Sequence, residues 1–283
     1  MAPIFLKWAG GKAQSLARIA PHIPNLVRDY YEPFLGGGSV LFHVLQTTTV
    51  ARQLVANDIN PRLIHLYKSV QSDIHALLDD LRALEEEANN APSAEEFYYV
   101  ARDLYNDNTD LDTWGDALFV YLNHNGFRGL YRENASGAFN VPFGHYRQVM
   151  LPSHQTFMQA HALFSNNRVT FECKNARELL NDAEDLGEED LVFLDPPYEK
   201  IAPTTFVAYH AGGAHFDPEN LCDWLETRGR RTRAIFTNHA TDALKTRFQD
   251  FPVCEVFSAR RAIHAHKPGA RADELLVCTH PAQ

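Results

Sequence analysis

The segment Asp195-Pro196-Pro197-Tyr198 combines residues whose side chains and carbonyls could carry out chemistry on a flat base. It follows the apolar run 191–194, which is typical of a buried parallel strand. Because neither proline can donate a ladder hydrogen bond, the strand should end here. In open α/β sheets, ligands bind at the carboxyl ends of strands. There, Asp195 and the Pro196 carbonyl could accept two N–H bonds from an exocyclic amine, while Tyr198 stacks on the ring. A plain strand followed by a turn is the alternative.

A glycine triplet, Gly36-Gly37-Gly38, follows a predicted strand and precedes a predicted helix. Glycines at such a turn let a ligand approach the backbone, and the helix N-terminus offers free N–H groups. Asp58 ends the next predicted strand, where a carboxylate commonly binds a ribose diol. This pairing indicates a nucleoside cofactor, either a dinucleotide or S-adenosylmethionine. A helix N-cap is the alternative role for Asp58.

The N-terminal run at residues 5–12 places two lysines around Trp8 and a Gly-Gly pair. One interpretation is a lid over a cofactor, in which Trp8 packs and Lys12 bonds to a carboxylate. The alternative is a buried tryptophan flanked by surface lysines. The run does not match a phosphate-binding loop, because Ala13 replaces the hydroxyl that such a loop uses to bind magnesium.

Short strand patterns alternate with helical patterns at both ends of the chain. This alternation predicts an α/β fold, a sheet with helices on both faces. The predicted strands are 29–34, 54–58, 168–173, 191–194, 233–237, 253–257 and 274–278, and the predicted helices are 154–164, 217–228, 241–250 and one from Ser39.

The middle of the chain has a different pattern. Helices with acidic faces are predicted at 60–87, 94–107 and 112–124, and two arms around Ser136-Gly137 predict a β-hairpin carrying arginines and aromatics. We therefore expect a discontinuous α/β domain, split by a mostly helical insertion. The expected boundaries are residues 1–60 and 153–283 for the α/β domain and 61–152 for the insertion.

The net charge of −10 is concentrated in residues 73–116, which hold 13 acids and 2 bases, so the rest of the chain is near neutral. A second acidic run, 182–190, is expected to be a solvated loop. Basic residues gather elsewhere, so a local basic surface can bind phosphates. These groups are Arg128, Arg132 and Arg147; Arg228, Arg230, Arg231 and Arg233; and Arg260, Arg261, Lys267 and Arg271.

Four scattered cysteines without CxxC spacing, and no apolar run long enough to span a bilayer, predict a cytoplasmic protein without a membrane segment. The histidines form no zinc signature, so no metal site is expected.

Taken together, these segments resemble the Dam-type (D12 class, alpha group) DNA adenine-N6 methyltransferases. Seven blocks occur in the order of that family. They are FLKWAGGK at 5–12, EPFLGGGS at 32–39, NDIN at 57–60, NGFRGLYR at 125–132, FNVPFGHY at 139–146, DPPY at 195–198, and RRAI at 260–263 with ADELLV at 272–277.

The resemblance implies a Rossmann-like methyltransferase sheet, with S-adenosylmethionine as methyl donor. It implies that Asp195, Pro196, Pro197 and Tyr198 are catalytic, with Asp195 also close to the cofactor. The other cofactor-binding residues that it implies are Trp8, Ala9, Gly10, Lys12, Phe34, Gly36, Gly38, Asp58 and Asn175. Near Asn175 the usual Asp-Phe pair of the family is missing.

The resemblance also implies double-stranded DNA as partner, with adenine flipped from the helix and GATC as the favoured target. It leaves open a cognate restriction endonuclease that acts separately, in a bacterial, archaeal or phage-encoded system. Residues implied to contact DNA are Lys7, Phe127, Arg128, Leu130, Arg132, Asn140, Pro142, Tyr146, Arg260 and Arg261. Arg128 stands where relatives usually carry Asn, and His145 where many carry Arg.

Two rival functions stay open from the sequence. A cytosine-N4 methyltransferase needs the same geometry but more often carries Ser at the position of Asp195. A DNA-binding relative without catalysis would not need Asp195, Tyr198, Asp58 and Lys12.

Overall fold

The computed structural model describes residues 2–198, 218–260 and 271–281. Their contacts group them into two compact units. The helical unit contains residues 2–11 and 60–166, and the α/β unit contains residues 12–59, 167–198, 218–260 and 271–281.

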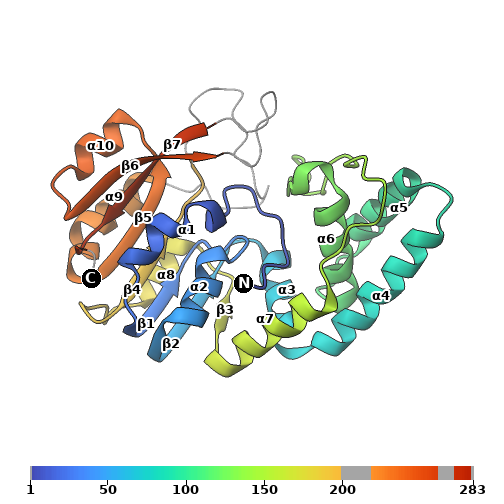
Figure 1. The fold of residues 1–283 in the computed structure, drawn as a ribbon, viewed down its shortest axis with the longest axis horizontal. Coiled ribbons are helices and arrows are strands. Elements are labelled where there is room, and N and C mark those ends of the chain that lie inside the picture. Colours follow the sequence, from blue (N-terminus) through green and yellow to red (C-terminus); the bar gives the residue numbers. More distant parts are fainter. Residues whose placement is uncertain (1, 199–217, 261–270, 282–283) are drawn as a thin grey trace. The chain divides into compact units, whose positions relative to one another are not determined.

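The α/β unit is built on a seven-stranded sheet with the order β3-β2-β1-β4-β5-β7-β6 (Figure 1). The first five strands are parallel, and β7 lies antiparallel between β5 and β6. The direction of the strand order reverses between β1 and β4, which is where open α/β sheets bind ligands. The predicted α/β fold is confirmed. The strands are β1 (Leu26–Glu32), β2 (Thr49–Asn57), β3 (Thr170–Glu172), β4 (Leu191–Leu194), β5 (Arg233–His239), β6 (Val253–Arg260) and β7 (Arg271–Cys278).

Helices cover both faces of this sheet. In Figure 1, α2 lies in front of the sheet, and α9 lies behind it. One core joins strand residues such as Val192 and Phe236 to Leu180 of α8, Leu225 of α9 and Phe248 of α10. The helices are α1 (Leu16–Ile19), α2 (Ser39–Thr47), α8 (Ala176–Asp182), α9 (Pro218–Thr227) and α10 (Asp242–Phe248).

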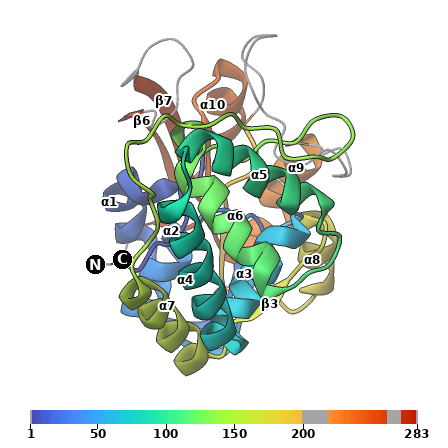
Figure 2. The same ribbon diagram turned by 90° about the vertical axis from the view of Figure 1, so that its right-hand side faces the viewer.

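The helical unit is organised around α6, which is buried along almost its whole length and packs against α3, α4 and α5 (Figure 2). Phe5 of the N-terminal segment packs in this unit, with its ring centroid 5.2 Å from those of Tyr67 and Phe157. The helices are α3 (Pro61–Ser72), α4 (Ile74–Asn90), α5 (Ala94–Asp107), α6 (Thr113–Asn125) and α7 (His154–Asn167). The single helix expected at 60–87 is wrong, because Asp73 leaves the helical conformation and separates α3 from α4.

The predicted hairpin folds back on itself but forms no continuous ladder. Its arms meet at two isolated antiparallel bridges, from Gly126 to Phe143 and from Glu133 to Phe139. The outer edge of one arm is held by α5. The Asn106 side chain accepts from the N–H of Phe139 at 2.8 Å and donates to its carbonyl at 3.1 Å.

The acidic run before β4 exposes its other acidic residues to solvent as expected, but its last residue, Asp190, is fully buried. Its carboxylate accepts hydrogen bonds from Arg28 Nε at 2.9 Å and Nη2 at 2.5 Å. It also accepts from the Gly187 N–H at 2.7 Å. Asp190 therefore anchors the loop to β1.

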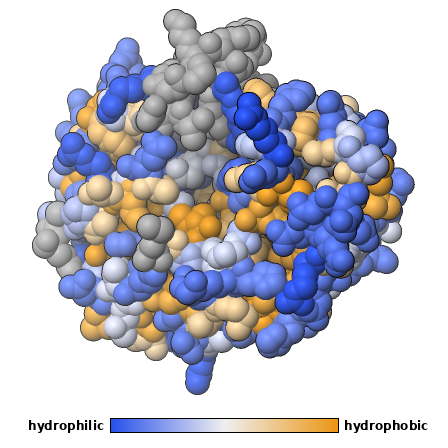
Figure 3. Space-filling view, turned by 45° about the vertical axis from the view of Figure 1, so that its right-hand side comes forward, coloured by the Kyte–Doolittle hydropathy of each residue, from blue (hydrophilic) through white to orange (hydrophobic). Residues whose placement is uncertain are grey.

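Hydrophilic residues cover most of the face seen in Figure 3, and hydrophobic residues form smaller groups between them. Within residues 2–198, 218–260 and 271–281, no helix has the length and apolar character needed to cross a membrane.

Candidate active site

Asn57 fixes the loops that follow three neighbouring strands. Its side chain is fully buried and donates to the carbonyls of Pro33 and Lys174, each at 3.0 Å. The same side chain accepts from the Lys174 N–H at 2.9 Å. One amide thereby connects the carboxyl ends of β1, β2 and β3. This role could not be predicted from the sequence, because Asn57 lies in a strand like many other polar residues.

The glycine turn after β1 depends on backbone conformations that favour glycine. Gly36 and Gly38 have φ values of 48° and 68°, and Gly38 is the N-cap of α2. The Asp58 carboxylate accepts from the Gly36 N–H at 3.0 Å, so the two predicted cofactor segments are in direct contact. The alternative N-cap role for Asp58 is wrong, because Asn60 caps α3 by accepting from the Leu63 N–H.

Asp195 follows β4 at the switch point and has partners on both carboxylate oxygens. Lys12 Nζ lies 2.7 Å from Oδ2, and the Thr237 hydroxyl donates to Oδ1 at 2.9 Å. The side chains of Lys12 and Asp195 are 3% and 17% exposed, so most water is excluded from this ion pair. Lys12 Nζ also lies 4.8 Å from the centroid of the Tyr198 ring. The centroids of the Tyr198 and His239 rings are 4.4 Å apart.

Among the described residues, three carboxyl groups at or near the Asp195 position have raised pKa values. Burial raises the pKa of Asp195, and the Lys12 charge together with hydrogen bonds from Lys12, Thr237 and Tyr198 opposes that rise. Burial also raises the pKa of Glu274, whose Oε2 accepts from the Ser15 hydroxyl at 3.1 Å.

The third carboxyl group is that of Glu32, at the end of β1. Burial raises its pKa to about 8, while the hydrogen bond from Tyr30, 2.6 Å long, lowers it. With a pKa of about 8, Glu32 holds its proton at neutral pH and adds no negative charge to the site there. The roles of Thr237, Glu274 and Ser15 were missed from the sequence, since each is an ordinary residue in its own segment.

The other predicted cofactor residues are divided between the helical unit and the α/β unit. In the helical unit, the Trp8 ring stacks on that of Tyr131, with 5.7 Å between centroids. Ala9 beside it is half-buried, and Gly10 is exposed with a φ of 79°. In the α/β unit, Phe34 packs against the sheet core.

Asn175 is the N-cap of α8, where its side chain accepts from the Arg177 N–H. The sequence had not predicted this helix. Capping of α8 is the role that Asn175 has in the folded chain. The contact of Asn175 with a cofactor stays a prediction.

Lys7 and Tyr146, both predicted to contact DNA, meet in the helical unit. Lys7 Nζ lies 4.9 Å from the Tyr146 ring centroid and donates to the His124 carbonyl at 3.0 Å. Asn123 on α6 accepts from the Lys7 N–H and donates to its carbonyl, so the backbone there is fixed. Burial lowers the pKa of Lys7.

The arms after α6 carry the remaining predicted recognition residues. Arg132 donates from Nη2 to the Asn140 carbonyl at 2.8 Å and from Nε to its side chain. Leu130 is half-buried and Pro142 is exposed. The Phe127 ring is 36% exposed, and the guanidinium of Arg128 lies 5.0 Å from its centroid.

Arg128 has a φ of 58°, a left-handed conformation that Asn adopts more readily than Arg. This is consistent with Asn as the usual residue there in the similar family. Two further residues were predicted to contact DNA. Arg260 ends β6, and Arg261 lies outside the described residues.

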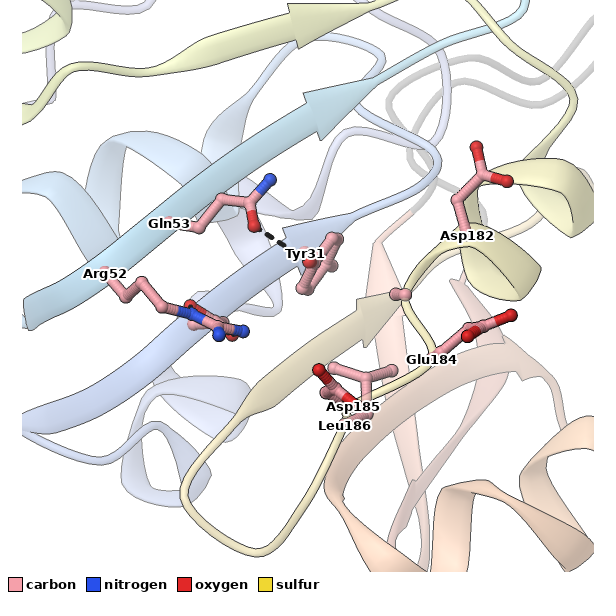
Figure 4. A pocket seen from close by; sticks show the side chains of 9 residues that line it. Tyr31, Arg52, Gln53, Asp182, Glu184, Asp185 and Leu186 are labelled. Carbon is pink, nitrogen blue, oxygen red and sulfur yellow. Dashed lines mark hydrogen bonds and ion pairs between the residues drawn. The ribbon is translucent and has the colours of Figure 1, made fainter.

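A pocket of about 370 Å³ lies elsewhere in the α/β unit. Figure 4 shows Tyr31, Arg52 and Gln53 of β1 and β2 facing the loop 182–186, which leads toward the amino end of β4. Since Asp195 follows the carboxyl end of β4, this pocket belongs to a different end of the sheet and is separate from the site.

Comparison with known proteins agrees with this geometry. A family model described as D12 class N6 adenine-specific DNA methyltransferase matches residues 8–262. Type II methyltransferase M.MjaIII of Methanocaldococcus jannaschii is 36% identical over 219 residues, which are 72% of this chain and 72% of that protein. A DNA adenine methylase of Vibrio cholerae is 32% identical over 282 residues, covering 98% of this chain and 96% of its own. The chain therefore belongs to the D12 class of N6 adenine-specific DNA methyltransferases.

Proposed function

We propose that the chain transfers a methyl group from S-adenosylmethionine to N6 of an adenine flipped out of duplex DNA, with GATC as the target. The observation that carries this proposal is the Asp195 carboxylate at the switch point, held by Lys12 and Thr237 next to the Tyr198 ring. An adenine amino group is a poor nucleophile because its lone pair is delocalised into the ring. A site that orients this group therefore supplies what the reaction lacks.

The residues present fit the proposed donor. Gly36 and Gly38 have backbone conformations that favour glycine at the turn after β1, and the Gly36 N–H donates to Asp58. This contact supports the proposal that Asp58 holds the ribose. When bound, S-adenosylmethionine supplies an electrophilic methyl group. Trp8, Ala9, Gly10, Phe34 and Asn175 are the further residues that we propose to contact it.

Asp195 and the Pro196 carbonyl each accept one N6–H bond and turn the lone pair toward the methyl carbon. Asp195 would accept the N6 proton that the amine loses when the bound donor methylates it. Each carboxylate oxygen of Asp195 has a second lone pair, so the contacts to Lys12 and Thr237 leave acceptor capacity. Alignment of the reactants can contribute about 7 kcal/mol or more.

DNA capture is assigned to the helical unit and to the end of β6. Arg132 suits a bidentate contact with guanine, Leu130 and Pro142 suit a thymine methyl, and Phe127 suits a wedge at the site of flipping. Lys7, Asn140 and Tyr146 complete the base-reading set, and Arg128 adds a contact to a phosphate or to guanine. Arg260 and Arg261 contact phosphates. Tyr198 stacks on the extruded base, which is worth about 1–3 kcal/mol.

The test uses purified protein, S-adenosylmethionine and two duplexes that differ only in one GATC site, followed by nucleoside mass spectrometry. We expect N6-methyladenine only from the GATC duplex. N6-methyladenine from both duplexes would refute the target and point to Arg128 and His145 as altered readers. Methylcytosine, or no methylation, would refute the proposed reaction.

A further inference from the structure

We propose that Thr237 is a positioning residue for methyl transfer: its hydroxyl fixes the plane of the Asp195 carboxylate and keeps the carboxylate ionised when the adenine amine arrives. This inference rests on the proposed role of Asp195. Thr237 lies on β5, next to β4 in the sheet, and its hydroxyl donates to Asp195 Oδ1 at 2.9 Å. Thr237 is fully buried, so no water can replace the hydroxyl without rearrangement.

The geometry assigns different tasks to the two partners of Asp195. Lys12 contacts Oδ2 and supplies charge, but an ammonium on a flexible stem does not define a plane. Thr237 contacts the other oxygen from a strand whose backbone is fixed on both sides, by β4 and by β7. Two contacts on different oxygens prevent rotation of the carboxylate, which orients its remaining lone pairs.

The hydroxyl also matters because the surroundings disfavour the Asp195 anion. Burial raises its pKa. Among the described residues, the charged or titratable groups that interact with it are Lys12 before α1, Glu32 on β1, Glu274 on β7, and Tyr198, whose ring lies against that of His239. A hydrogen bond to the charged form lowers the pKa of the carboxyl group. Loss of the hydroxyl therefore raises the pKa of Asp195 while all these charges stay in place.

The decisive variant is Thr237→Val, which keeps the shape and removes the hydroxyl. With saturating S-adenosylmethionine and DNA, we expect kcat at neutral pH to fall roughly tenfold, the size of a lost hydrogen bond to a charged group. The acidic limb of the kcat profile should move up by about one pH unit. KM values for cofactor and DNA should stay near wild type. Thr237→Ser should restore both the wild-type kcat and the wild-type position of the acidic limb. Thr49→Val, the same change at an exposed strand position, is the control.

A wild-type kcat and acidic limb in Thr237→Val would overturn the inference. A lower kcat with an unmoved limb and no rescue by Thr237→Ser would also overturn it, by indicating packing alone. The carboxyl signal of Asp195 in ¹³C NMR, assigned by its loss in Asp195→Asn, gives its pKa without an activity assay. The inference expects this pKa to rise in Thr237→Val even if the transferred group or the target proves different from the proposed ones.

Discussion

Lys12 and Asp195 form a buried ion pair, with 2.7 Å between Nζ and Oδ2. The sequence indicated that Lys12 bonds to a carboxylate, and in the folded chain that carboxylate is the one proposed to bind the target amine. Removing one member of a buried pair leaves an uncompensated charge and costs about 3–5 kcal/mol. The pair therefore links the stability of the site to its chemistry.

Tyr198 provides a test of base capture. We expect Tyr198→Ala to lower turnover, because the flipped adenine loses a stacking surface worth about 1–3 kcal/mol. A fluorescent adenine analogue at the target position should show less extrusion in this variant. Tyr198→Phe keeps the ring and should extrude the base as wild type does. Equal extrusion in all three proteins would rule out the stacking role.

Glu32 should make the fold less stable as pH rises. Burial raises its pKa from its usual 4.5 to about 8, so between these values the folded chain holds a proton that the unfolded chain has lost. Its contribution to stability is complete below pH 4.5 and disappears as pH rises toward 8. Glu32→Gln resembles the protonated form and should flatten this decline by more than about 1 kcal/mol.

Urea unfolding of wild type and Glu32→Gln at pH 5 and pH 8 measures the effect. Asp195 and Glu274 also have raised pKa values and act in the same direction, so the informative quantity is the difference between the two proteins. An identical pH dependence in both would contradict the assignment to Glu32.

Asn57 should be a stability residue although it lies next to the proposed cofactor site. Asn57→Ala leaves the Pro33 carbonyl and the Lys174 backbone groups without their buried partner. We expect the free energy of unfolding to fall by at least about 2 kcal/mol. Asn181→Ala, at an exposed position of α8, should change it little. Equal free energies of unfolding for Asn57→Ala and Asn181→Ala would show that the Asn57 contacts do not stabilise the fold.

Arg132 gives a test of sequence reading. Arg132→Ala should reduce the preference for GATC over a site with an altered guanine, by about 1–3 kcal/mol in relative kcat/KM. A phosphate contact would instead weaken methylation of both duplexes and reduce the salt dependence of binding. Competition between the two duplexes at several salt concentrations separates these outcomes, and uniform weakening would reassign Arg132 to the backbone.

Local signals were sufficient for much of the fold. The apolar run Leu191–Leu194 matches β4, and the helix predicted at 94–107 matches α5. Short elements without a local pattern were missed, such as α8 and the polar first half of β2. For the site, motifs indicated Lys12 and Asp195, which stand beside glycine and proline, and Asp58, which ends a predicted strand. Thr237 lies in an ordinary strand, and only the pairing of β4 with β5 brings it to Asp195.

The most direct test of the central claim is a comparison of wild type with Asp195→Asn. Both proteins are titrated with S-adenosylmethionine by calorimetry and then assayed for N6-methyladenine on a GATC duplex in a single turnover. We predict similar affinity for the cofactor and no detectable methyl transfer by Asp195→Asn, because the amide cannot act as the anionic acceptor. Methyl transfer at the wild-type rate by that variant would contradict the assignment of Asp195 and of the mechanism built on it.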